Sequence, residues 1–156
     1  SQKLLAYVNY NNIVNTDENI NSGGVHALLI TNEGLIILQQ RDDKPGIAGP
    51  GRIGLFGGQL ENSENLEEGL RRELLEELNW DIVNQNCEFF GRFYKTKEID
   101  GIDWVVNVFL IENVDLRELE LNEGTNFVIG NPEELLKNER ITRIVKLVLE
   151  KYVQNY

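Results

Sequence analysis

Leucine recurs at every fourth position between residues 66 and 78, and this repeat constrains the fold more than any other feature of the chain. Apolar residues at this spacing form one stripe along an α-helix. The leucines of the stripe are Leu66, Leu70, Leu74 and Leu78. We expect Asn62 or Ser63 to cap the start of the helix, because either side chain can accept a hydrogen bond from a backbone N–H of the first turn.

Strand-like apolar segments lie on both sides of this helix. They are residues 25–30, 35–38, 55–56, 87–95, 104–111 and 127–129. Turn-forming residues separate them at 31–34 and 100–101, and residues 42–51, which contain two prolines and three glycines, are expected to form a loop.

Two further helices are predicted near the end of the chain. A short one opens at Pro132, and an amphipathic one extends from Ile141 to Tyr152. The order of strands, helix, strands and helices predicts an α/β fold, with a mixed β-sheet covered by helices in a three-layer α/β/α sandwich. A chain of 156 residues supplies one sizeable core, so residues 1–156 are expected to form a single domain.

Cysteine and histidine each occur once, as Cys87 and His26. One thiol cannot form a disulfide within the chain, and one thiol with one imidazole cannot build a zinc site. A metal site in this chain must therefore use carboxylate and carbonyl oxygens, which favours Mg²⁺, Mn²⁺ or Ca²⁺.

Acidic residues dominate the charge of the chain, with 26 acids against 15 bases and a formal net charge of −11. This field repels a long polyanion, so we expect no nucleic-acid polymer as a partner. A small phosphate ester remains compatible, because bound cations can invert the local charge. No apolar run approaches the roughly 20 residues that cross a bilayer, and the first residues do not resemble a signal peptide. We therefore expect no membrane partner and a cytoplasmic location.

Three carboxylates, Glu73, Glu76 and Glu77, follow each other at i, i+3 and i+4 and project from one side of the helix. Like charges at this spacing repel, and the last two also lie in the final turn, where the helix dipole disfavours anions. A bound divalent cation would reverse both effects. The alternative is a solvated acidic face, partly neutralised by Arg71 and Arg72, as is common in acidic proteins.

Gly57 and Gly58 lie between a strand end and this helix. Glycine permits unusual backbone angles and the close approach of a ligand or metal to a carbonyl oxygen. A backbone oxygen here would complement the three carboxylates, which favours a metal site over a solvated face.

Residues 58–80 resemble the signature of the Nudix family, G-x5-E-x7-R-E-U-x-E-E-x-G-U, in which U is apolar. The matching residues are Gly58, Glu64, Arg72, Glu73, Leu74, Glu76, Glu77 and Trp80. Asn79 replaces the second glycine. Asparagine is the next most tolerant residue of the left-handed conformation used after a helix, so we expect a mild structural substitution. The resemblance covers residues 25–150, specifically in the signature and more weakly elsewhere.

The resemblance implies a Nudix fold and an Mg²⁺ cofactor, for which Mn²⁺ can substitute. It makes Glu73, Glu76 and Glu77 the catalytic metal ligands, helped by the Gly57 carbonyl oxygen. Glu64 and Arg72 would instead have a structural role, as an ion pair that orders the loop and the helix.

The remaining site residues carry open alternatives. Glu123 matches a loop from which some family members supply a further catalytic carboxylate, and an ordinary turn acid is the equal alternative. Arg41, Phe56 and Gly58 would bind the substrate. Guanidinium suits phosphate geometry, but a surface salt bridge is the alternative for Arg41.

The implied reaction is that of a pyrophosphohydrolase, in which water attacks one phosphorus of a nucleoside diphosphate derivative. The substrate would be a nucleoside triphosphate, as in members that remove oxidised nucleotides, or a nucleotide sugar. The alternative is a non-catalytic nucleotide sensor with the same fold, but such sensors usually lose signature carboxylates. A small phosphate-containing molecule is thus the expected partner, and a homodimer is compatible with the sequence.

Four aromatic residues of the predicted strands have two interpretations. They are Tyr94, Trp104, Phe109 and Phe127. Each could stack on a nucleobase, but strand aromatics are more often buried, which favours packing in the core.

Overall fold

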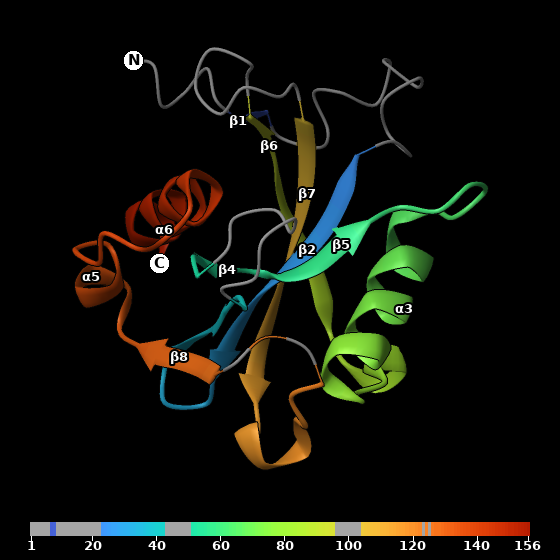
Figure 1. The fold of residues 1–156 in the computed structure, drawn as a ribbon, viewed down its shortest axis with the longest axis horizontal. Helices are drawn as coiled ribbons and strands as arrows, with labels where there is room; N and C mark the ends of the chain where they lie inside the picture. Colours follow the sequence, from blue (N-terminus) through green and yellow to red (C-terminus); the bar gives the residue numbers. More distant parts are fainter. Residues whose placement is uncertain (1–6, 9–22, 43–50, 96–103, 123, 125) are drawn as a thin grey trace.

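A computed structural model of the chain describes residues 7–8, 23–42, 51–95, 104–122, 124 and 126–156. Within these residues, eight strands form one sheet. The strands are β1 (Tyr7–Val8), β2 (Gly24–Thr31), β3 (Ile36–Gln40), β4 (Ile53–Gly54), β5 (Phe56–Gln59), β6 (Cys87–Lys95), β7 (Trp104–Val114) and β8 (Asn126–Gly130). Their order is β1-β6-β7-β2-β3-β4, with β5 paired to β2 and β8 paired to β3 (Figure 1).

The central strand β2 makes the sheet mixed. One side of β2 pairs in parallel with β7, and the other side pairs antiparallel with β5 and then with β3. In this register Gly57 stands opposite His26, and Gly58 stands opposite Val25. The glycine pair therefore lies beside the centre of the sheet.

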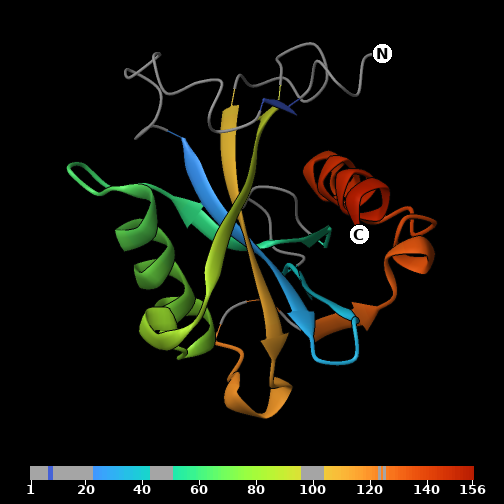
Figure 2. The ribbon, with the colours of Figure 1, turned by 180° about the vertical axis from the view of Figure 1, so that it is seen from behind.

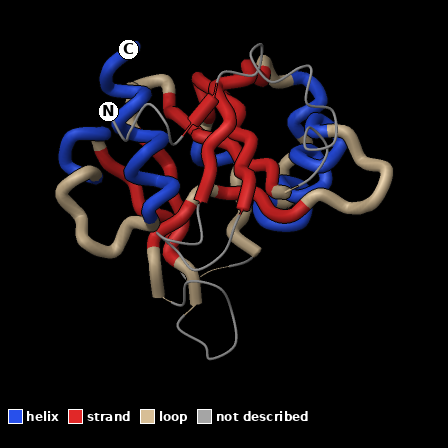
Figure 3. The backbone as a smooth tube through the Cα atoms, turned by 90° about the horizontal axis from the view of Figure 1, so that it is seen from above, coloured by secondary structure: helices blue, strands red, loops and turns tan. Residues whose placement is uncertain are grey.

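Helices cover both faces of the sheet. α3 (Leu66–Leu78) lies on one face, and α5 (Pro132–Leu135) with α6 (Arg143–Asn155) lies on the other, as Figures 2 and 3 show from behind and from above. Two short 3-10 helices, η2 (Ile82–Asn84) and η3 (Leu116–Glu118), follow α3 and β7. The predicted three-layer α/β/α sandwich with a mixed sheet is confirmed.

Side chains of β2 contribute to both layers of the core. Val25, Ala27 and Leu29 pack with the leucines of α3, whereas Leu28 and Ile30 pack with residues of α6. Successive side chains of a strand point to opposite faces of the sheet, so both faces of β2 must be apolar. This explains why its sequence is a continuous apolar run rather than an alternating one.

Asn65 caps α3, so the prediction of Asn62 or Ser63 is wrong. The Glu68 N–H donates to Asn65 Oδ1 at 2.8 Å, and the Asn65 N–H donates to Glu68 Oε1 at 3.0 Å, which is a capping box. Ser63 instead has a φ of 71°, whereas an N-cap residue takes extended angles. The spacing of Asn65 and Glu68 was the sequence signal for this start.

Other boundaries differ from prediction by a few residues. β7 continues to Val114, and α6 begins two residues after Ile141, because Thr142 caps it and Ile141 forms a parallel bridge with Ile53. Most of the predicted loop at 42–51, and the whole predicted turn at 100–101, lie outside the described residues. None of the helices in the described part of the chain is long and apolar enough to cross a bilayer.

Candidate active site

Glu77 is buried between α3 and β5. Its side chain is 3% exposed, and the Gly57 backbone N–H donates to its Oε1 at 2.7 Å. This charge-assisted hydrogen bond offsets part of the unfavourable burial of a carboxylate. Gly57 has a φ of 138°, and a Cβ there would collide with the Val25 carbonyl oxygen, so this position requires glycine.

Glu73, one turn earlier in α3, lies against Gly58. A Cβ at Gly58 would stand 2.5 Å from Glu73 Cδ, so glycine is what lets the carboxylate approach the strand. The side chain of Glu73 is 14% exposed and that of Glu76 is 54% exposed. The three carboxylates thus share one side of the helix, with Glu77 deepest and Glu76 outermost.

Arg72 connects the loop before α3 to the helix. Its Nε and an Nη donate to the two oxygens of Glu64 at 2.7 and 3.0 Å, and its Nη atoms also reach Glu73 Oε1 at 2.9 Å and the Gln59 carbonyl oxygen at 3.0 Å. The guanidinium hydrogen bond is the largest cause that holds the pKa of Glu64 below its ordinary value, and the same bond raises the pKa of Arg72. The structure therefore contains the ion pair expected for Glu64 and Arg72.

Asn79 ends α3 in the left-handed conformation that the sequence predicts, with φ 50° and ψ 38°. Its backbone N–H donates to the Leu75 carbonyl oxygen at 3.0 Å, and its Nδ2 donates to Glu120 Oε2 at 3.3 Å. Asn122 meets the same helix end, where its Nδ2 donates to the Glu76 carbonyl oxygen at 3.2 Å. Sequence analysis missed both Glu120 and Asn122, because no local pattern relates them to a helix some forty residues earlier.

The three residues predicted to bind the substrate, Gly58, Arg41 and Phe56, have different surroundings in the fold. Gly58 lies at the carboxylates, whereas Arg41 follows β3 and lies beside β4, where its backbone N–H donates to the Arg52 carbonyl oxygen at 2.8 Å. Phe56 is fully buried, with its ring centroid 6.0 Å from that of Phe127. The ring of Phe56 thus packs in the core, and the role of Phe56 in substrate binding stays a prediction. Glu123 lies outside the described residues.

The other aromatic residues of the strands differ in their burial. Phe109 is buried and packs edge-to-face on Phe89 at a centroid distance of 5.3 Å, which confirms the core interpretation for this residue. Tyr94 is half-buried, and the guanidinium carbon of Arg92 lies 5.7 Å from its ring centroid. The side chain of Trp104 lies outside the described part of the structure.

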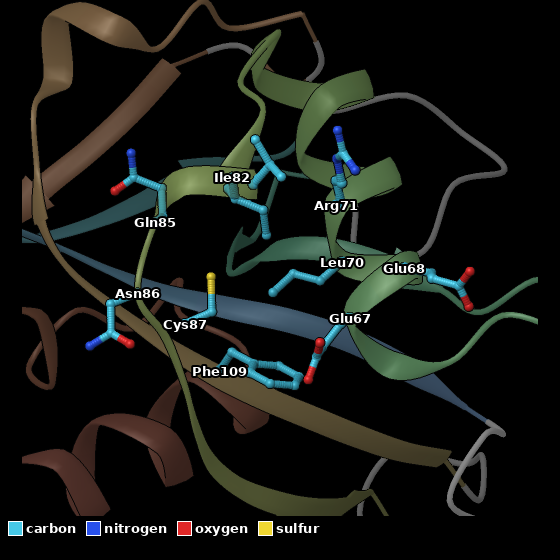
Figure 4. Close-up of a pocket in the computed structure, with 10 residues that line it drawn as sticks. Glu67, Glu68, Leu70, Arg71, Ile82, Gln85, Asn86, Cys87 and Phe109 are labelled. Carbon is cyan, nitrogen blue, oxygen red and sulfur yellow. The ribbon is translucent and has the colours of Figure 1, made fainter.

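A pocket of about 460 Å³ lies on another flank of α3 (Figure 4). Leu70, Ile82 and Phe109 give it an apolar wall, and Glu67 and Cys87 also line it. Burial, and secondarily the charge of Glu67, raises the pKa of the Cys87 thiol, which disfavours the thiolate. The signature carboxylates do not line this pocket, so it is separate from the candidate site.

The donors on α3 suit Mg²⁺ in kind, because they are all oxygens. Among the described residues, no three Asp, Glu, His or Cys side chains already form a group that could hold a metal ion. Glu73 is engaged by Arg72 at 2.9 Å, and Glu77 by the Gly57 N–H at 2.7 Å. Coordination by all three carboxylates would therefore require their side chains to turn toward the ion.

The fold is an α/β sandwich with a mixed sheet between helices. One helix carries a row of carboxylates and packs on a glycine pair beside the centre of the sheet. The family model of the NUDIX domain matches residues 21–146. The chain belongs to the Nudix family, which confirms the prediction of a Nudix hydrolase at the level of the family.

Individual relatives match this chain over a shorter stretch than the family model does. Nucleoside triphosphatase NudI of Escherichia coli O139:H28 is 46% identical over 55 residues, which is 35% of this chain and 38% of the relative. The chain thus spans well under half the length of the curated relatives it matches.

Solved structures match over most of the chain. The MutT protein of Methanosarcina mazei Go1 has a TM-score of 0.68 and 19% identity, covering 84% of this chain and 91% of that one. A MutT NUDIX hydrolase of Burkholderia pseudomallei has a TM-score of 0.68 and 22% identity, covering 83% and 96%. At these identities the likeness shows a shared fold.

Proposed function

We propose that this protein hydrolyses a diphosphate linkage in a nucleoside diphosphate derivative, with Mg²⁺ as its cofactor. The observation that carries the proposal is the arrangement of carboxylates at the glycine pair, with Glu77 buried on Gly57, Glu73 against Gly58 and Glu76 exposed. The last turn of α3 contains no basic residue, and Arg72, one turn earlier, is the base that reaches Glu73 at 2.9 Å and Glu76 at 3.5 Å. Mutual repulsion and the helix dipole oppose such a cluster, and Arg72 offsets this only in part, so a bound cation would compensate charge that the fold leaves uncompensated.

Glu73, Glu76 and Glu77, with the backbone carbonyl of Gly57, would hold the metal. Bound Mg²⁺, or Mn²⁺ in its place, neutralises phosphate charge and lowers the pKa of a bound water. The chain contributes the geometry: Arg72 ties Glu73 to the preceding loop, and Gly58 leaves room beside that carboxylate.

The proposed substrate is a small molecule, foremost a nucleoside triphosphate. The name of the relative that shares 46% identity, a nucleoside triphosphatase, supports this choice. Nucleotide sugars are the second substrate class, because that relative is matched over only part of its length. Arg41 as a phosphate contact and Glu123 as a further catalytic carboxylate remain proposals, as does a cytoplasmic location.

A product-release screen tests the proposal. Nucleoside triphosphates, nucleotide sugars and dinucleotides are offered with Mg²⁺ and with EDTA, and monophosphate, pyrophosphate and phosphate are measured. We expect turnover of one class that disappears with EDTA and in Glu77→Gln. Glu67→Gln is the matched control, because Glu67 is exposed and lines the pocket on the other flank of the same helix. Full turnover in chelator would remove the metal from the proposal, and tight binding without turnover would favour a nucleotide sensor.

A further inference from the structure

The last turn of α3 has a hydrogen-bond donor for each of its terminal carbonyl groups. The last four carbonyls of a helix have no partner within the helix and usually depend on water or a cap. Here most of the donors come from Glu120 and Asn122, a segment distant in sequence. The bonds are Asn79 N to Leu75 O at 3.0 Å, Asn122 Nδ2 to Glu76 O at 3.2 Å, Asn122 N to Glu77 O at 2.8 Å, and Glu120 N to Leu78 O at 2.9 Å.

Asn122 contributes the two bonds that matter most for the site. Its backbone N–H and its side-chain amide bind the carbonyl oxygens of the adjacent residues Glu77 and Glu76. N–H groups at this end also oppose the negative pole of the helix dipole, which these two acids otherwise aggravate. The bond from Asn79 Nδ2 to Glu120 Oε2 adds a side-chain link between the same two segments.

We propose that Asn122 is a positioning residue for the metal site: its two hydrogen bonds lock the last turn of α3 and so set where the Glu76 and Glu77 carboxylates stand. Helix ends fray unless they are bonded. A fraying last turn would move the exposed Glu76 freely and would strain the bond that holds Glu77 on Gly57. This inference rests on the proposed function in one respect, that Glu76 and Glu77 bind the ion.

A plain helix cap would stabilise the fold without influencing metal binding, and two readouts separate the alternatives. The first is amide hydrogen exchange across residues 75–79, measured by NMR without metal. The second is the dissociation constant for Mn²⁺, measured by electron paramagnetic resonance without substrate. Asn122→Ala and Asn122→Leu both remove the side-chain donor without adding a charge, and the second nearly preserves the size of asparagine.

Asn155→Ala is the matched control. Asn155 Nδ2 donates to the Lys151 carbonyl oxygen at 2.9 Å, so this variant removes the same kind of bond from the end of α6, on the other face of the sheet. In the Asn122 variants we expect faster exchange at residues 75–79 and Mn²⁺ binding weakened by roughly two- to tenfold, the factor that one hydrogen bond is worth. The control should leave both unchanged.

Native Mn²⁺ affinity in both Asn122 variants would overturn the inference, whether or not the helix end exchanges faster. Failure of the wild-type protein to bind Mn²⁺ would also overturn it, together with the assignment of the ligands. Weakened Mn²⁺ binding in a protein that hydrolyses no substrate class would instead leave the positioning role intact and reject the proposed hydrolysis.

Discussion

At the scale of single residues, Glu76 and Glu77 are neighbours in sequence with opposite environments. Glu76 is more than half exposed, whereas Glu77 is almost completely buried and bonded to the Gly57 N–H. Their spacing in the sequence predicted a shared side of the helix, which the structure shows. It did not predict the difference in depth, because depth depends on β5 and the unusual backbone of Gly57.

Substituting these two acids separates a structural contribution from a catalytic one. Glu77→Gln should weaken the charge-assisted bond to Gly57 and lower the free energy of unfolding by about 1 kcal/mol or more. Glu76→Gln should change it by no more than about 0.5 kcal/mol, as is usual for an exposed position. Turnover should fall in both by more than the roughly 10- to 100-fold typical of outer-sphere partners of a metal. Urea unfolding and steady-state kinetics check the two effects. Near-native turnover in Glu76→Gln would assign Glu76 to a solvated acidic face, and near-native turnover in Glu77→Gln would make the buried Glu77 a structural carboxylate.

Asn79 offers a test of whether the departure from the Nudix signature harms the protein. Asn79→Gly removes the strain of φ 50° but also the bond to Glu120, so the free energy of unfolding should change by less than about 1 kcal/mol. Asn79→Val should be clearly less stable, because a β-branched side chain resists positive φ. Melting temperature and turnover are both measured. A gain of orders of magnitude in turnover for Asn79→Gly would mark the natural protein as a crippled hydrolase.

At the scale of elements, the loop before α3 and the helix itself depend on one ion pair. Arg72 binds both oxygens of Glu64 and the carbonyl of Gln59, and Glu64 Oε1 also accepts the Glu61 N–H at 2.8 Å. These contacts fix the loop relative to the first turns of α3. The loop in turn follows β5, which carries the glycine pair, so these contacts connect the pair and the carboxylate-bearing helix into one unit.

The depressed pKa of Glu64 predicts how this unit responds to acid. Because the folded pKa lies below the ordinary value of 4.5, the ion pair contributes its full stability above pH 4.5 and loses it as the pH falls through the folded pKa. The difference in unfolding free energy between wild type and Glu64→Gln should therefore be constant from pH 7 to about pH 5 and shrink at lower pH. Urea unfolding at a series of pH values measures it. Glu67→Gln, a charge change on the other flank of α3, serves as the control, and a pH-independent difference for Glu64→Gln would contradict the ion-pair argument.

Features of these elements that depend on residues close in sequence can be predicted from the sequence, and features that depend on distant segments cannot. The period of α3 and the apolar run of β2 predict their type, because their pattern directly reflects which faces are buried. The start of α3 is also encoded locally, in the capping box of Asn65 and Glu68, but the residues at 62–63 are equally good cap formers by type, and the fold does not use them as a cap. The burial of Phe56 and the hydrogen bonds of Asn122 to the end of α3 depend on segments that meet only in the folded protein. No local sequence pattern therefore predicts them.

At the scale of the whole molecule, the fold places several acids of a strongly acidic chain on one helix beside the sheet. The chain has a net charge of −11, and α3 places three of its acids beside the centre of the sheet, between β5 and the lock at Glu120 and Asn122. β5 and the segment of Glu120 and Asn122 bond the helix that carries these acids. A cation that binds there stabilises the folded state, because the unfolded chain does not assemble the same ligands.

Divalent cations should therefore raise the thermal stability of the intact protein. Binding to the folded state alone adds about 2.7 kcal/mol at a free-ion concentration 100 times the dissociation constant, and the effect grows with the logarithm of concentration. Melting temperatures are measured across a Mg²⁺ series and reversed with EDTA, at constant ionic strength so that general screening of the net charge is held fixed. Glu76→Gln should shift the midpoint of this response to higher Mg²⁺, since it removes one proposed ligand with little effect on the apo fold, whereas Glu67→Gln should follow the wild type. A stabilisation that is equal in all three proteins would show that Mg²⁺ acts through the overall charge and not through the carboxylates of α3.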